Sequence, residues 1–194
     1  MQPENFYEVI KMNLGPKESV ITPEGVFIIG TYDENGVPNA MNAAWGSQSD
    51  FDEITLYLSN HKTTENVLKT KAFTVAYGTK STVEISDYFG IETGAKANKI
   101  EKAGCHVHKS KLVNAPVIEE YPLTLECECR SFDEKTGILV GKIVGQEASD
   151  SIITDGKVDL SKLEPIVFDM VTKTYRVVGP VVGYAWKDGL KFKK

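Results

Sequence analysis

Three stretches of the sequence hold residues that could bind a ligand. The first, Pro38 to Ser49, reads PNAMNAAWGSQS and sets Asn39, Asn42 and Trp45 among small alanines. Small side chains let a planar ligand approach the backbone, so the amides of Asn42 to Trp45 could donate to a heterocycle beside two fixed asparagines. An alanine-rich strand packed against a helix or a subunit is the simpler interpretation of the same residues.

The second stretch, SNHKTTENV from Ser59 to Val67, takes the end of a strand into the start of a helix. Free amides and the positive dipole end of a helix favour an anion, and Lys62 would add a full charge. This pattern predicts a phosphate seat. A polar turn capped by Thr63 or Thr64 is the more ordinary alternative.

The third stretch, Phe89 to Gly104, carries Lys96, Lys99 and Lys102. These lysines could bring positive charge over a bound phosphate. A solvated helix face explains them equally well.

Two of the three histidines and all three cysteines could bind a metal or take part in redox chemistry. His106 and His108 would share one face of a strand and could in principle bind a metal, but a third ligand is missing nearby, so we expect no metal site. The cysteines, Cys105, Cys127 and Cys129, are odd in number and lack C-x-x-C spacing, which favours a reducing compartment. We expect Cys127 and Cys129 to be core residues of a strand.

The elements around these stretches read mostly as strands. Val26 to Tyr32 is β-branched and apolar and is followed by Asp33 to Gly36, whose Asn-Gly pair predicts a hairpin with a return strand from about Val37. Glu53 to Ser59 alternates as a half-buried strand does. A short helix from Thr63 or Thr64 to about Lys71 should lead directly into the strand AFTVAYGT.

The second half of the chain begins with a change of pattern. Residues 81 to 103 predict two short helices joined by GIETGA. From Pro122 the chain predicts a hairpin of two long strands around Asp133 to Thr136, and then small strands in PIVFDMV, YRVVG and VVGYAW. Many strands with few helices favour one barrel domain over residues 1–194.

Composition excludes several classes of protein. The hydrophobic fraction is 41% and the charged fraction 25%, as in ordinary globular proteins. A formal net charge of -5 argues against a nucleic-acid partner. We find no long apolar run, signal-like N-terminus, nucleophile elbow or P-loop, so we expect a cytoplasmic protein that is neither a membrane protein nor a hydrolase.

Taken in order, these motifs resemble the FMN-binding, flavin reductase-like split-barrel family, in particular its flavoredoxin branch. The marks are PNAMNAAW, SNHKTTENV before KAFTVAY, the segment Gly90 to Lys99, NAPVIEEYPLTLECE and the closing YRVVGPVVGYAW. The resemblance implies a mainly β split barrel with short helices and a helical insertion. It also implies an oxidoreductase that transfers electrons through non-covalently bound FMN.

The resemblance further implies which residues hold the flavin. Those around the ring and ribityl chain would be Asn39, Met41, Asn42, Ala43, Ala44 and Trp45. Ser59, Lys62 and Thr63 would hold the phosphate, and Lys99 would contact it from a lid. The family's flavin lies at a subunit interface, which implies a homodimer, and no side chain need act as a catalytic base.

One departure bears on the electron donor, which in many relatives is NADH or NADPH. These reductases carry a Gly-Asp-His-Thr turn between the two long strands, whereas this chain reads Asp133, Glu134, Lys135, Thr136. The histidine associated with nicotinamide is absent, which favours an electron carrier reduced by a protein donor. A third hypothesis is a split barrel that binds haem or a compound like pyridoxal phosphate, because one fold hosts many functions.

Overall fold

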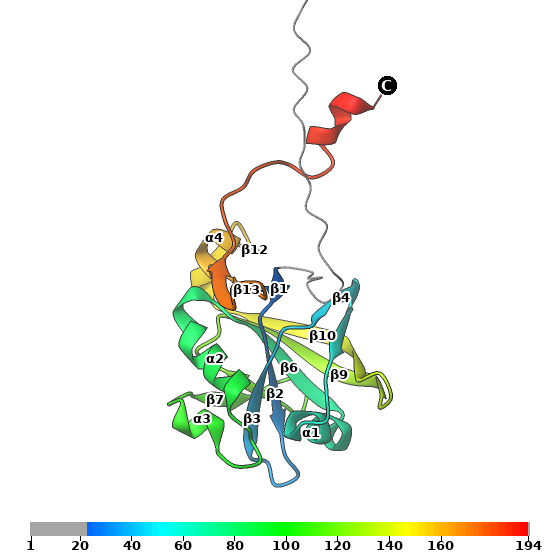
Figure 1. Cartoon of the computed structure of the whole chain (residues 1–194), viewed down its shortest axis with the longest axis vertical. Helices are drawn as coiled ribbons and strands as arrows, with labels where there is room; N and C mark the ends of the chain where they lie inside the picture. The colour runs from blue at the N-terminus through cyan, green and yellow to red at the C-terminus, as the bar shows by residue number, and fades with distance from the viewer. Residues whose placement is uncertain (1–22, 194) are drawn as a thin grey trace, which may run out of the picture.

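An antiparallel sheet of seven strands dominates the computed structural model, which describes residues 23–193. The sheet curls into a half-barrel (Figure 1). Its order across the sheet is β3-β2-β6-β9-β10-β5-β4. The bounds are β2 Phe27–Tyr32, β3 Pro38–Ala43, β4 Gly46–Asp50, β5 Glu53–Tyr57, β6 Ala72–Tyr77, β9 Leu123–Asp133 and β10 Ile138–Ala148. The predicted mainly β split barrel is therefore confirmed.

Small sheets and short helices surround this half-barrel. The helices are α1 Lys62–Thr70, α2 Val83–Ile91, α3 Lys99–Lys102 and α4 Leu160–Leu163. The short strands are β1 Glu24–Gly25, β7 Val107–Lys109, β8 Pro116–Ile118, β11 Ile153–Thr154, β12 Lys157–Val158, β13 Ile166–Asp169 and β14 Thr174–Val177. Helices α2 and α3 are the predicted insertion, whereas α4 was not predicted. Within the described residues, no helix is long and apolar enough to cross a membrane.

Strand alternation builds the core of the half-barrel. Ile54 and Leu56 of β5 are buried with Leu125 and Cys127 of β9 and Phe73 of β6 in one cluster. The predicted hairpin of long strands is confirmed, since β9 and β10 pair along their whole length. Cys127 is fully buried and Cys129 packs against the same cluster, as expected for core residues.

A second apolar cluster fixes the helical insertion against the sheet. Ile28 of β2 and Ala40 of β3 point away from the barrel interior and pack with Phe89 and Ile100. Because successive side chains of a strand alternate between faces, β2 and β3 can bury both of theirs. The insertion is therefore held directly beside β3.

One prediction about strands is confirmed, and the small strand predicted in VVGYAW was wrong. The return strand predicted from about Val37 is β3, but it ends at Ala43, and the chain bends at Ala44 and Trp45 before β4 at the opposite edge of the sheet. The run VVGYAW forms no strand, and Val182 is 98% exposed. Within the described residues no strand edge lies beside this run, and a strand needs such an edge.

The predicted threonine cap of the first helix was also wrong. Helix α1 begins at Lys62 behind the extended residue His61, and it has no side-chain cap. Thr63 and Thr64 lie inside the first turn, where their hydroxyls bond to groups outside the helix. The Thr64 hydroxyl donates to the Ser59 carbonyl at 2.7 Å, and the Thr63 oxygen accepts from Asn39.

Candidate functional site

A cavity of about 300 Å³ lies where β3, the start of α1 and residues 89–99 meet. Met41, Asn42, Lys62, Thr63 and Lys99 of the predicted binding residues line it. Strand β3 is the edge of the seven-stranded sheet, so one side of its backbone pairs with no strand of that sheet. An edge strand offers free amides and carbonyls to a ligand.

The start of α1 gives this cavity a positive end. The first amides of a helix have no partner within the helix, and at α1 no side chain caps them. Lys62 lies in that first turn, and its nearest acidic partner is Glu65 at 3.8 Å. Free amides, the helix dipole and one ammonium group therefore all favour an anion here.

Asn39 provides a buried acceptor behind the cavity wall. Its Nδ2 donates to Thr63 Oγ1 at 2.8 Å, whereas its Oδ1 has no hydrogen-bond partner among the described residues. The residue is only 7% exposed, and leaving such an oxygen unpaired costs roughly 1 to 3 kcal/mol.

Gly94 packs directly against this acceptor, which is possible because it has no side chain. A Cβ at position 94 would overlap Asn39 Oδ1. Gly94 and His61 both line the cavity, although neither was predicted as a binding residue from the sequence. The glycine inside a turn next to lysines was the available signal.

Two of the predicted binding residues already hold the cavity wall in place. Asn42 Nδ2 donates to the Ser86 carbonyl of α2 at 2.9 Å. Lys99 Nζ donates to the Phe89 and Glu92 carbonyls, both at 3.0 Å, and so bonds to the end of α2. Burial lowers the pKa of Lys99 to about 8, against the opposing charge of Glu92. Both side chains therefore position α2 and the loop that follows it.

Of Met41 and Ala43, only Met41 lines this cavity. Both side chains belong to the core cluster of the half-barrel. Ala44, half-buried, begins the turn that leads to Trp45.

The two remaining predicted residues lie in a larger hollow of about 650 Å³. Trp45 and Ser59 line it together with Tyr57 and the turn Glu134–Gly137. The Trp45 and Tyr57 side chains are 56% and 53% exposed. The structure thus divides the predicted binding residues between two hollows that flank residues 59–64.

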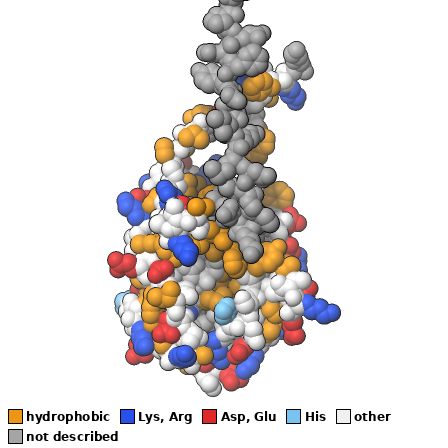
Figure 2. All heavy atoms as spheres, viewed as in Figure 1, with side chains coloured by type: hydrophobic (Ala, Val, Ile, Leu, Met, Phe, Trp, Pro, Cys, Tyr) orange, Lys and Arg blue, Asp and Glu red, His pale blue; other side chains and the backbone are white. Residues whose placement is uncertain are grey.

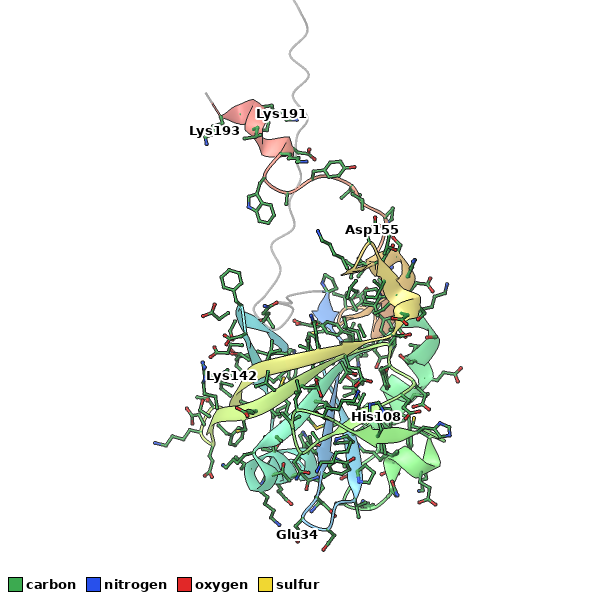
Figure 3. All side chains as sticks on the ribbon, turned by 180° about the vertical axis from the view of Figure 1, so that it is seen from behind. Glu34, His108, Lys142, Asp155, Lys191 and Lys193 are labelled. Carbon is green, nitrogen blue, oxygen red and sulfur yellow. The ribbon has the colours of Figure 1, made fainter. Side chains whose placement is uncertain are left out.

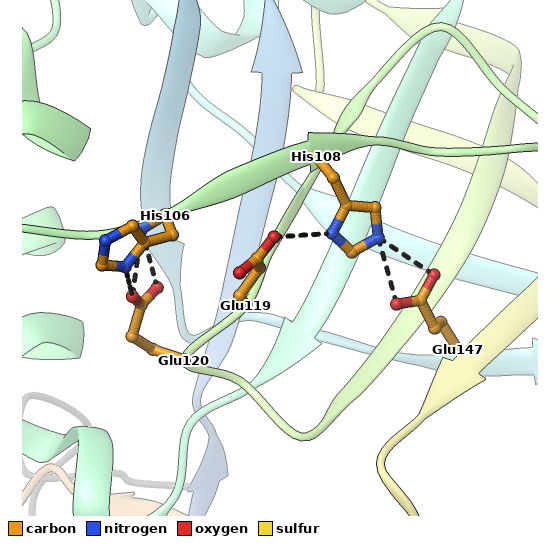
Figure 4. Close-up of polar contacts among 5 residues, drawn as sticks. All are labelled: His106, His108, Glu119, Glu120 and Glu147. Carbon is orange, nitrogen blue, oxygen red and sulfur yellow. Dashed lines mark hydrogen bonds and ion pairs between the residues drawn. The ribbon is translucent and has the colours of Figure 1, made fainter.

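The histidine pair makes separate contacts with carboxylates (Figure 4). His106 Nδ1 lies 2.9 Å from Glu120, and His108 lies between Glu119 at 3.2 Å and Glu147 at 3.1 Å. The hydrogen bond to Glu147 raises the pKa of His108. Within residues 23–193, no group of three or more acidic, histidine or cysteine side chains could hold a metal ion.

Comparison with known proteins identifies the class. The model of the flavin reductase like domain matches residues 20–158, and the chain belongs to this family. Among solved structures it is similar to the flavoredoxin of Desulfovibrio vulgaris (Miyazaki F), with 28% identity and a TM-score of 0.88 over 93% of this chain and 100% of that one. For the flavoredoxin of Methanosarcina acetivorans the values are 26% and 0.85, over 94% and 99%.

A curated relative extends the comparison without adding a function. An uncharacterized protein of Aquifex aeolicus (strain VF5) is 28% identical over 152 residues, which is 76% of each chain. The recognised family and its flavoredoxin neighbours thus agree with the resemblance seen in the sequence.

The family binds FMN, and the smaller cavity suits this cofactor. A phosphate matches the uncapped start of α1 and Lys62. The edge strand β3, whose Met41 and Asn42 line the cavity, offers backbone groups that could bond to the ring or the ribityl chain. The residues present therefore fit the group.

Proposed function

We propose that this protein is an FMN-binding electron carrier of the flavoredoxin type, reduced by a protein donor. The observation that carries the proposal is the cavity that joins an uncapped helix start and Lys62 to the edge strand β3. Bound FMN would supply the redox chemistry by taking up electrons and passing them on. The similarity to two flavoredoxins over more than 90% of the chain supports the same assignment.

The chain's own residues would bind and orient the cofactor. Lys62 and the first amides of α1 would hold the phosphate, and Thr63 would fix the side chain of Asn39 by accepting its hydrogen bond. Asn42 and Lys99 would keep the wall formed by α2 rigid. Such fixed polar groups orient a cofactor without reorganisation when it is reduced.

The turn between β9 and β10 supports a protein donor over a nicotinamide. Asp133 Oδ1 accepts from the Lys135 amide at 2.8 Å, and Gly137 follows with a φ of 73°. This turn borders the larger hollow and presents Glu134 and Lys135 where related reductases have their histidine. Direct oxidation of NADH or NADPH, by an enzyme that reduces free flavin or a small acceptor, is the competing function.

We also propose that the protein is a cytoplasmic homodimer. The three cysteines are free, and burial raises the pKa of the Cys105 thiol to about 12, which keeps it unreactive. A subunit interface would cover the open hollow beside Trp45.

The deciding experiment is the visible spectrum of the purified protein without oxygen. We expect two flavin bands that persist when NADH and then NADPH are added and bleach when a reduced ferredoxin is added. Bleaching by a nicotinamide would establish the reductase instead. A Soret band, or colourless protein that neither binds FMN nor is stabilised by it, would overturn the assignment.

A further inference from the structure

The last part of the chain leaves the body of the protein. Residues 179–193, here called the C-terminal arm, lie away from the half-barrel (Figure 1). The Val178 amide still donates to Pro165 at 3.2 Å, but every backbone hydrogen bond of the arm itself in the described chain stays within it. The arm nevertheless carries six large apolar side chains that are more than half exposed: Val181, Val182, Tyr184, Trp186, Leu190 and Phe192. Apolar surface gathered in this way marks an interaction site.

The outer half of the arm has a local structure that presents one aromatic ring. Asp188 accepts from the Tyr184 amide at 2.8 Å, and a short helical turn follows over Asp188–Phe192. Trp186 has a φ of 59°, which is rare for a bulky residue, and is 93% exposed. The arm therefore presents the ring of Trp186 to solvent.

The body of the same chain offers an apolar surface of complementary kind. The hollow of about 650 Å³ is lined by the half-exposed rings of Trp45 and Tyr57 and by Leu58, Leu68 and Phe132. Aromatic side chains in such a hollow are the usual receptors of an inserted anchor.

Charge points to the same pairing. The arm has Lys187, Lys191 and Lys193 against one acid, Asp188, and Figure 3 shows Lys191 and Lys193 well away from the body. Figure 2 shows hydrophobic side chains beside a lysine at the outer end of the arm. The whole chain carries a net charge of -5, and the hollow is lined by two acids, Glu65 and Glu134, against one base, Lys135. A basic arm is therefore attracted to the body of another copy.

We propose that the C-terminal arm of one copy docks in the hollow beside Trp45 and Tyr57 of a second copy. One chain carries both the arm and the hollow, so a two-fold dimer makes the contact twice and leaves neither surface free. The inference rests on the homodimer proposed above and identifies the segment that closes the hollow beside the flavin site. It does not require FMN to be bound.

The test measures association of the full chain by sedimentation velocity, in buffer without added flavin. We expect a dimer for the natural chain. The double variant Val182→Asp and Trp186→Asp on the arm, and Tyr57→Asp in the hollow, should each raise the dimer dissociation constant about a hundredfold or more. Val171→Asp is the matched control, because Val171 is apolar and 64% exposed but lies outside both surfaces.

Tyr57 lies in β5, so the thermal unfolding of the Tyr57→Asp variant is recorded to show that the variant folds. If this variant does not fold, the arm variant alone decides the test. A monomeric natural chain, or a dimer that survives the arm substitutions, would overturn the proposal. A monomeric natural chain with a shielded Trp186 would show the arm folded onto its own body. FMN binding to each variant, measured separately by absorbance, tests the proposed function, whereas the dimer dissociation constant without flavin tests the arm.

Discussion

The two hollows on either side of residues 59–64 differ in almost every physical property. The smaller cavity is bordered by buried polar groups with fixed partners, such as Asn39 on Thr63 and Lys99 on two carbonyls. The larger hollow is lined by aromatic rings about half exposed, and the one hydrogen bond between Trp45 and Tyr57 joins their backbones. The first is organised within one chain, whereas the second has an apolar surface left open.

This difference indicates that the two hollows bind in different ways. Buried polar groups in fixed geometry select charge and hydrogen bonds, so the smaller cavity should decide the affinity for the phosphate end of a ligand. Exposed aromatic rings contribute most when a partner covers them. The comparison therefore predicts strong effects of substitutions around the small cavity and weaker effects in the large hollow.

The largest effect is expected from Gly94→Ala. The new methyl group would displace Asn39 Oδ1 and the hydrogen bond to Thr63. We expect a loss of about 3 kcal/mol in FMN binding, on the order of a hundredfold in the dissociation constant. Fluorescence titration with FMN measures it.

The control for this prediction is Gly90→Ala, in the same wall of the cavity. A Cβ there would meet Asn42 Cβ at 3.4 Å, an ordinary contact. Its affinity should remain close to that of the natural protein. Equal affinities for both variants would show that Asn39 does not face the ligand.

Next in size is Lys62→Ala, which removes the positive charge in the first turn of α1, where the phosphate is proposed to bind. A charge-assisted contact of this kind predicts a loss of roughly 1.5 to 3 kcal/mol in FMN binding. Titrations with FMN and with riboflavin separate the phosphate from the ring, and only the affinity for FMN should fall. Lys69→Ala is the control, since Lys69 lies at the other end of α1 and pairs with Glu34 at 2.8 Å. Unchanged affinity of the Lys62 variant would remove that residue from the site.

A smaller, pH-dependent effect is expected at Lys99. Its pKa falls from 10.5 to about 8 in the folded protein because of burial. Between these values the unfolded chain binds more protons than the folded one, so the free energy of unfolding should rise with pH through this window. Lys99→Met should remove that rise in urea titrations at pH 7.5, 9 and 10.

Lys102→Met provides the comparison for the pH effect. Lys102 lies on the same short helix with an exposed side chain. It should retain the pH dependence of the natural chain. If the Lys99 variant also retained it, the ammonium group would not be desolvated as the structure indicates.

The smallest effect is expected from Trp45→Ala in the large hollow. A half-exposed ring should contribute about 1 kcal/mol to flavin binding, roughly fivefold in the dissociation constant. The same fluorescence titration compares it with Lys62→Ala. A larger loss for Trp45→Ala than for Lys62→Ala would reverse the ranking of the two hollows.

The sequence by itself determined the elements whose signals are local. The alternation of Ile54 and Leu56, the Asn-Gly turn at Asn35 and the long hairpin around Asp133 all follow from the geometry of a few neighbouring residues. The order of the motifs was also enough to indicate the family, because each motif occupies a short continuous stretch.

Only the tertiary structure decided what the candidate binding side chains contact. Asn39 and Thr63 are 24 residues apart, and Asn42 meets Ser86 across 44. The chain bends after β3, so Trp45 leads to β4 at the opposite edge of the sheet. The predicted binding residues are therefore divided between two hollows. Periodicity reports only which face a residue occupies. Its partners depend on which distant elements pack there, and the free energy of the whole core determines that packing.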